Sequence, residues 1–235
     1  MLQVGDHEKV RSITLDRTDK LNAFDVPLEV ALAAALGEAA ADPELSVAVI
    51  TAAGRAFSAG VDRDVEAVEV AGSMLEPFDA FELLVDALAD FPKPLIFAVN
   101  GLAVGMGATI LALGDLVLMA RGARVRFPFA QLGIVPEAGS TFTLPALLGQ
   151  QRAAWMLMSS EWFDAEQCKR FGLALEVHPE SELEAAALAR ATTLAQGSLA
   201  SLVATKRALI AARADRLDSA RRLERESFER IATGH

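Results

Sequence analysis

Apolar positions in the first two thirds of the chain follow strand and helix patterns in turn. "VRSITLD" alternates as a strand does, and "PLEVALAAALGEAAAD" is an alanine-rich helical run that begins with proline. "SVAVITA", "PLIFAVN" and "LVLMA" are short apolar runs typical of buried strands, and the amphipathic "EPFDAFELLVDALADF" separates the first two. The repeated order of strand, loop and helix predicts an α/β fold.

Beyond Gln150 the strand patterns end and the apolar positions follow a helical period. The segments with this period are "DAEQCKRFG", "SELEAAALARATTLAQ", "SLASLVATKRALIAA" and "SARRLERESFERIA". We therefore predict two parts, an α/β core over residues 1–195 and a helical region over residues 196–235.

The charge-free stretch from Pro94 to Gly114 is long enough to span a bilayer. Asn100 and four glycines divide it into a strand-like and a helix-like part, and Asp115 follows at once, so we expect no membrane span. The N-terminus is charged where a secretory signal would be apolar, and the single cysteine, Cys168, has no partner for an internal disulfide. These features favour the cytoplasm.

The charge balance limits the kinds of partner. A formal net charge of −10 and a pI near 4.8 argue against a general nucleic-acid binder, which needs a basic face. Since the sequence has no CxxC motif and no cluster of cysteine and histidine, we expect no metal. An anionic ligand would need a local basic patch.

Two glycine-containing loops, "FSAGVD" and "GLAVGMGAT", each follow a predicted buried strand. Glycine lets the backbone turn sharply and expose its amides, so the two loops could present two N–H groups to one oxygen anion. Ordinary strand-to-helix turns are the alternative, because loose glycine patterns are common. A dinucleotide site at "GMGATI" is weakly indicated, since the third glycine of GxGxxG is missing.

Five pieces of the chain, taken in order, resemble the crotonase, or enoyl-CoA hydratase/isomerase, superfamily. They are "RTDKLNAF", "VAVITAAGRAFSAGVD", "KPLIFAVNGLAVGMGATILALGDLVLMA", "PFAQLGIVPEAGST" and "SLASLVATKRAL". The resemblance implies a crotonase-like spiral of ββα turns with a C-terminal helical trimerisation region, and so a homotrimer or hexamer. It also implies an acyl-CoA thioester as substrate and no other cofactor.

The resemblance further implies an oxyanion hole made by the backbone N–H groups of Val61 and Met106. Met106 stands where the family frequently has glycine, but a backbone donor does not depend on the side chain. Removal of a proton next to a thioester carbonyl places enolate charge on the oxygen, and two preorganised amides stabilise that charge.

Carboxylates distinguish the reactions of this family. Its hydratases use two glutamates to activate water, and those positions hold Thr109 and Phe129 here. The apolar Phe129 would tend to exclude water, and we expect it to contact the substrate. Its peroxisomal-type Δ3,Δ2-enoyl-CoA isomerases place one glutamate in a segment like "PFAQLGIVPEAGS", and that position is Glu137. The resemblance therefore favours an isomerase that converts 3-enoyl-CoA to 2-trans-enoyl-CoA with one base, whose pKa an apolar setting would raise.

Alternatives to this assignment stay open at the level of sequence. Glu137 could be a solvated loop residue that complements the dipole of the following helix. The chain could be an enoyl-CoA hydratase or catalyse another crotonase-type reaction. Because two family acids are missing, it could also be a catalytically silent acyl-CoA-binding protein.

Substrate contacts are expected from the same resemblance and from apolar patterning. Ala23 and Ala59 match positions whose backbone meets the adenine and pantetheine of CoA, while Asp62 either contacts ligand or braces its loop. Met74 and Phe78, in the apolar stretch 65–81, are predicted to line the acyl pocket, with core packing as the alternative. The cations that could meet the CoA phosphates are Arg17, Lys20 and Arg63, and Lys206 lies in a piece that resembles the late CoA-contacting helix of the family.

Overall fold

The structure is a computed structural model that describes residues 1–62, 68–70 and 73–234. Its largest sheet has six strands in the order β1-β2-β3-β7-β9-β12. β1 and β2 form an antiparallel hairpin, and each later neighbour in the sheet is parallel. The strands are β1 (Leu2–His7), β2 (Val10–Leu15), β3 (Val47–Ala52), β7 (Leu95–Val99), β9 (Leu116–Ala120) and β12 (Glu176–His178).

A second sheet of four strands has the order β11-β10-β8-β4. Three strands of the large sheet, β3, β7 and β9, are each followed within a few residues by one strand of this sheet, so the chain winds through both sheets three times. This arrangement confirms the expected α/β fold with ββα turns. The bounds are β4 (Ala56–Ser58), β8 (Leu102–Val104), β10 (Arg124–Arg126) and β11 (Trp162–Asp164).

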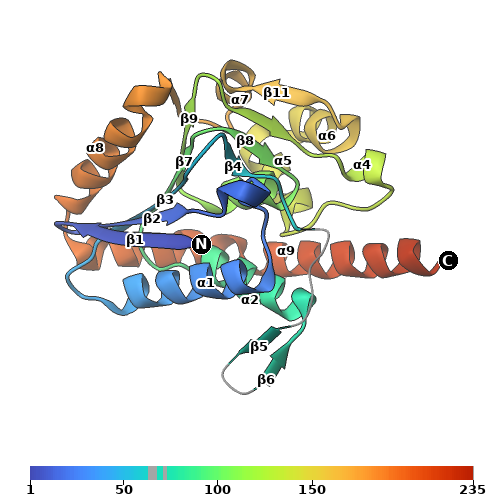
Figure 1. The fold of residues 1–235 in the computed structure, drawn as a ribbon, viewed down its shortest axis with the longest axis horizontal. Coiled ribbons are helices and arrows are strands. Elements are labelled where there is room, and N and C mark those ends of the chain that lie inside the picture. Colours follow the sequence, from blue (N-terminus) through green and yellow to red (C-terminus); the bar gives the residue numbers. More distant parts are fainter. Residues whose placement is uncertain (63–67, 71–72, 235) are drawn as a thin grey trace.

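Helices cover the large sheet and close the core. α1 (Val26–Ala41) and α2 (Pro77–Ala89) pack against each other, and α8 (Leu183–Ala195) packs against β2, β3, β7 and β9 (Figure 1). The shorter helices are α3 (Met106–Thr109), α4 (Phe129–Leu132), α5 (Ser140–Leu148), α6 (Gln150–Ser159) and α7 (Ala165–Phe171), with 3-10 turns η1 (Thr18–Lys20), η2 (Ile110–Leu113) and η3 (Glu180–Glu182).

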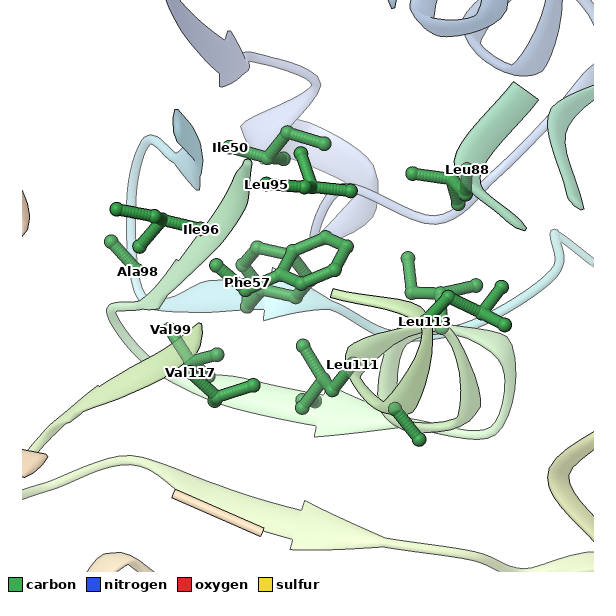
Figure 2. Packing of buried hydrophobic residues seen from close by; sticks show 14 of the residues in the cluster. Ile50, Phe57, Leu88, Leu95, Ile96, Ala98, Val99, Leu111, Leu113 and Val117 are labelled. Atoms are coloured by element: carbon green, nitrogen blue, oxygen red, sulfur yellow. The ribbon is translucent and has the colours of Figure 1, made fainter. Parts of the chain in front are cut away.

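The core lies where the two sheets and η2 meet. Phe57 of β4 is fully buried among Leu95 of β7 and Leu111 of η2 (Figure 2). Its ring meets that of Phe97 edge to face, with centroids 6.0 Å apart. Aromatic and aliphatic packing at this junction fixes the small sheet on the large one.

The last helix, α9 (Leu199–Thr233), is continuous over 35 residues. Two separate helical patterns in the sequence therefore form one helix, which runs along the body of the protein and packs against α5 (Figure 1). The division into domains at residue 195, like the homotrimer or hexamer, stays a prediction.

Two features differ from the sequence-based expectations. Strands β11 and β12 lie beyond Gln150, so the expectation that strands end there is wrong. Each has three residues, too few to show a period of two in the sequence. A hairpin of β5 (Val68–Val70) and β6 (Ser73–Leu75), which projects beside α2 in Figure 1, was also not expected.

The charge-free stretch from Pro94 to Gly114 forms β7, β8, α3 and η2. Within the residues that the structure describes, no helix is long and apolar enough to cross a membrane.

Lys206 of α9 is placed differently from the expected contact with CoA. It is 3% exposed, and its Nζ lies 2.5 Å from Asp115 Oδ2, which also accepts the Leu95 N–H at 2.8 Å. The lysine therefore joins the N-terminal half of α9 to the start of β7.

We predict that Lys206→Met lowers the free energy of unfolding by about 2 kcal/mol, because it leaves the Asp115 carboxylate without its cation. The loss should be smaller than for a fully buried pair, since solvent reaches Asp115. Urea unfolding followed by circular dichroism measures it, with Lys169→Met on the exposed face of α7 as control. Equal stabilities of the two variants would contradict this role.

Candidate active site

The two glycine loops lie against each other. A Cβ atom at Gly60 would be 2.8 Å from the Val104 carbonyl oxygen, and one at Gly107 would be 2.7 Å from the Ser58 Cβ. Gly60 also has a φ of +93°, which side chains rarely adopt. Glycine at both positions is therefore what lets the loops approach this closely.

Two unused backbone donors lie at this contact. In the part of the chain that the structure describes, neither the Val61 N–H nor the Met106 N–H donates to a protein acceptor. The loops bring them close, since a Cβ at Gly60 would lie 3.7 Å from the Met106 nitrogen. Met106 is fully buried as a whole residue, and its side chain packs in the core. The arrangement can bind one oxygen anion.

Residues before α1 clamp the first loop. The Phe24 N–H donates to the Gly60 carbonyl and the Asp62 N–H donates to the Phe24 carbonyl, both at 2.7 Å. Arg17 donates to Asp62 at 2.7 Å and to the Ala23 carbonyl at 3.0 Å. It also pairs with Asp25 at 3.1 Å.

The clamp changes the roles expected for several residues. Arg17 and Asp62 brace the loop through each other, so the guanidinium is not placed to meet a CoA phosphate. Ala59 and Ala23, whose backbones were expected to meet CoA, use their N–H groups within the protein. The Ala59 N–H donates to the Leu21 carbonyl at 3.0 Å, and the Ala23 N–H donates to the Lys20 carbonyl at 3.1 Å. Lys20 is exposed in η1 beside this loop. Arg63 and the start of the stretch 65–81 lie outside the described residues.

Glu137 lies half-buried in the loop between α4 and α5. Its Oε1 accepts a hydrogen bond of 2.6 Å from the Thr109 hydroxyl. Burial raises the pKa of Glu137 from 4.5 to about 7; the Thr109 hydrogen bond opposes this shift and the nearby charge of Glu224 adds to it. A carboxylate with this pKa can accept and return a proton near neutral pH.

The turn after Glu137 is conformationally demanding. Ala138 and Gly139 both have a positive φ, +58° and +71°, which costs a non-glycine residue about 1 kcal/mol. Ala138 is nevertheless buried, at 2% exposure. The turn aims the Glu137 side chain back toward Thr109.

Glu224 of α9 holds this turn in place. Its carboxylate accepts the Gly139 N–H at 2.8 Å, the Thr141 N–H at 2.9 Å and the Thr141 hydroxyl at 2.6 Å. Burial raises the pKa of Glu224, and these hydrogen bonds oppose the shift. Glu224 was not expected from the sequence, although its spacing from Leu217 and Ala220 places it on the buried face of α9.

A cavity of about 540 Å³ opens beside Glu137. Its wall is formed by α1, the first glycine loop, the start of α2, the loop before α5 and the end of α9. The residues that line it include Glu29, Val61, Pro77, Phe78, Phe81, Glu82, Ile134, Glu137, Arg221, Glu224, Arg225, Phe228 and Glu229.

Three of the residues singled out from the sequence, Val61, Phe78 and Glu137, thus line one cavity. The other residues singled out, among them Met106, Met74 and Phe129, are not in its wall. Met74 lies on β6 with 62% exposure, and Phe129 is buried in the core at 2% exposure. The structure therefore does not place Met74 at this cavity, and its contact with the acyl group stays a prediction.

Ion pairs fix α9 against α2 at the cavity wall. Arg221 donates to Glu82 and lies 2.6 Å from Asp86. Arg225 lies 3.4 Å from Glu82, and its guanidinium covers the Phe78 ring at 4.4 Å from the centroid. Arg221 is thus bound by two carboxylates, whereas Arg225 has a looser ion pair and a side chain that is 47% exposed.

Glu29 is a further carboxyl group in this wall that the sequence analysis missed. It lies in α1 at 2% exposure, and within the described ranges its side chain forms no hydrogen bond or ion pair. Burial, together with the charge of Asp25, raises its pKa to about 8. Its spacing from Leu32, Ala33 and Leu36, on the apolar face of α1, is the signal that could have indicated burial.

Comparisons with known proteins show which family the chain resembles. Residues 5–234 match the family described as enoyl-CoA hydratase/isomerase. The 1,2-epoxyphenylacetyl-CoA isomerase of Escherichia coli is 35% identical over 95% of this chain and 86% of its own length. A probable enoyl-CoA hydratase of Rhodobacter capsulatus is 37% identical over 86% of this chain and 77% of its own.

A solved structure shows the same fold. The crystal structure of an enoyl-CoA hydratase/isomerase from Pseudoalteromonas atlantica superimposes with a TM-score of 0.91 at 30% identity, over 98% of this chain and 91% of that one. The expected crotonase fold is confirmed.

We predict that Glu29→Gln stabilises the protein increasingly as the pH rises. A folded-state pKa of about 8, above the ordinary 4.5, means that the stability contributed by the bound proton is complete below pH 4.5 and is lost as the pH rises through 8. Glutamine has no such proton to lose. The gain over the wild type should grow by on the order of 3 kcal/mol between about pH 5 and 8.

Urea unfolding at both pH values measures this gain, with Glu38→Gln on the exposed face of α1 as the matched control. A gain that does not grow with pH, or that grows equally in the control, would contradict the assignment.

Proposed function

Since the chain belongs to the enoyl-CoA hydratase/isomerase family, we propose that it is an isomerase that moves the double bond of a 3-enoyl-CoA thioester to the 2-trans position. The observation that supports this reaction best is the placement of Glu137. Its carboxylate lines the cavity together with Val61 and is held by Thr109 at 2.6 Å.

In the proposed reaction the thioester oxygen accepts the N–H groups of Val61 and Met106. Glu137 removes a proton from C2, and the electron pair moves into a dienolate whose negative charge lies on that oxygen. The protonated Glu137 then returns the proton to C4, and the double bond forms between C2 and C3. One carboxylate thus carries out both proton transfers, and the reaction needs no cofactor beyond the CoA of the substrate.

The residues at the two hydratase positions favour isomerisation over hydration. Thr109 donates to Glu137 instead of supplying a second acid, and Phe129 is buried in the core. The relatives include both an isomerase and a probable hydratase, so their names do not decide between the reactions. Hydration or another crotonase-type reaction is the second candidate, and silent acyl-CoA binding is the third.

We predict that Glu137→Gln lowers kcat on a 3-enoyl-CoA by on the order of 10²-fold or more, because glutamine keeps the shape but carries no proton between C2 and C4. Affinity for CoA should change little, and the two amides should leave some residual turnover. Steady-state kinetics with chromatographic identification of the product is the measurement.

Glu166→Gln is the control variant, because it removes a carboxylate elsewhere in the protein, on the exposed side of α7. Near-normal turnover by Glu137→Gln would remove Glu137 as the base. A 3-hydroxyacyl-CoA product would identify a hydratase, and a wild type without turnover would favour a binding protein.

We predict that kcat/KM of the wild type rises with pH through about 7, as Glu137 loses its proton in the free enzyme. Thr109→Val removes the hydrogen bond that lowers this pKa, so the midpoint should move to higher pH. Turnover at neutral pH should fall several-fold while the alkaline plateau is largely kept. A midpoint that stays in place or moves to lower pH would contradict the role of Thr109.

A further inference from the structure

Glu29 is a polar group that faces the cavity and has no assigned task. It lines the same cavity as Val61 and Glu137 at 2% exposure. Its backbone is fixed in α1, whose N-cap Asp25 accepts the Leu28 N–H at 3.0 Å. A buried carboxyl group without a partner is unfavourable, and such a group is normally hydrogen-bonded. Within the residues described, the cavity is the direction from which a partner can come.

The part of the wall that belongs to α2 is largely apolar. Pro77, Phe78 and Phe81 line it, and the two rings lie 6.4 Å apart. These side chains suit the hydrocarbon part of an acyl group. Glu29 adds one hydrogen-bonding group to this largely apolar cavity. A single polar group in an apolar pocket selects ligands that carry a matching polar substituent at that position.

The charges around the cavity disfavour an anionic substituent. Arg221 is engaged by Glu82 and Asp86, and Arg225 by Glu82 and the Phe78 ring. Glu224 and Glu229 also line the cavity, so a carboxylate on the acyl group would meet negative charge.

The protonation state of Glu29 disfavours a cationic substituent. Burial raises its pKa to about 8, so the carboxyl group keeps its proton at neutral pH and offers no negative charge. A protonated carboxyl has one O–H donor and one carbonyl acceptor. Its best complement is a neutral oxygen. Such an oxygen can accept a hydrogen bond from the carboxyl O–H and, if it belongs to a hydroxyl group, can also donate one to the carboxyl C=O.

We propose that Glu29 forms a binding site for a hydroxyl or keto oxygen on the acyl group, so that the preferred substrates are oxygenated acyl-CoA thioesters. This inference rests on the proposed function only in that the acyl group occupies the cavity. A site built around such a hydrogen bond discriminates against the analogue without the oxygen, because that analogue leaves the buried carboxyl group unpaired.

The test is calorimetric binding of saturated acyl-CoA thioesters, which have no double bond to isomerise. Straight-chain ligands from butanoyl to decanoyl are compared with their terminally hydroxylated counterparts, so that one chain length brings the oxygen to Glu29. In the wild type, at least one hydroxylated ligand should bind about 10-fold more tightly than its unsubstituted partner. Glu29→Leu should abolish the difference, and Glu29→Gln, which keeps a donor and an acceptor, should retain most of it.

Equal binding within every pair in the wild type, or a preference that survives in Glu29→Leu, would overturn the inference. Tighter binding of a terminally carboxylated or aminated ligand than of the hydroxylated one would also overturn it. The isomerase proposal is tested separately. A hydroxyl preference without turnover of any 3-enoyl-CoA would contradict the isomerase proposal but would still support the Glu29 site. Turnover without the preference removes that site alone.

Discussion

The turn after Glu137 is the constraint on which the site depends. Two consecutive residues with positive φ reverse the chain there, and the N–H groups of Gly139, which is buried, and Thr141 would lose their acceptor without the Glu224 carboxylate. A Cβ at Gly139 would lie 2.1 Å from Leu217 of α9, so the helix sits directly on the turn. The helical region from residue 196 onward thus fixes the direction of Glu137, the proposed base.

Those parts of the fold that follow from local pattern could be predicted from the sequence. β3, β7 and β9 are continuous apolar runs, and Gly60 and Gly107 stand where only glycine fits. β11 and β12 have no such pattern, because they are held by pairing with β10 and β9. In the site, Glu137 was expected from the resemblance of its segment to the isomerases of the family, whereas Glu29 and Glu224 lie on helices whose partners are distant in the chain.

Glu224, Glu137 and Glu29 line the cavity. Their carboxyl groups suit different tasks because they have different hydrogen-bond partners. Glu224 accepts three hydrogen bonds and serves to hold a turn. Glu137 accepts one, from Thr109, and stays able to exchange a proton. Glu29 has none among the described residues, and its pKa is raised to about 8. Burial without full compensation costs stability, which proteins tolerate mainly at functional sites.

The protonation states of these groups bear on the proposed chemistry as a set. The dienolate carries a full negative charge near Val61, in a cavity whose wall holds five glutamates and two arginines that are already paired. Were all five ionised, their repulsion would oppose the charge that the two amides stabilise. Glu137 takes up a proton in the same step that creates the dienolate, and burial keeps Glu29 neutral throughout. Burial therefore strengthens Glu137 as a base. Burial also keeps Glu29 uncharged, so that Glu29 does not raise the energy of the dienolate.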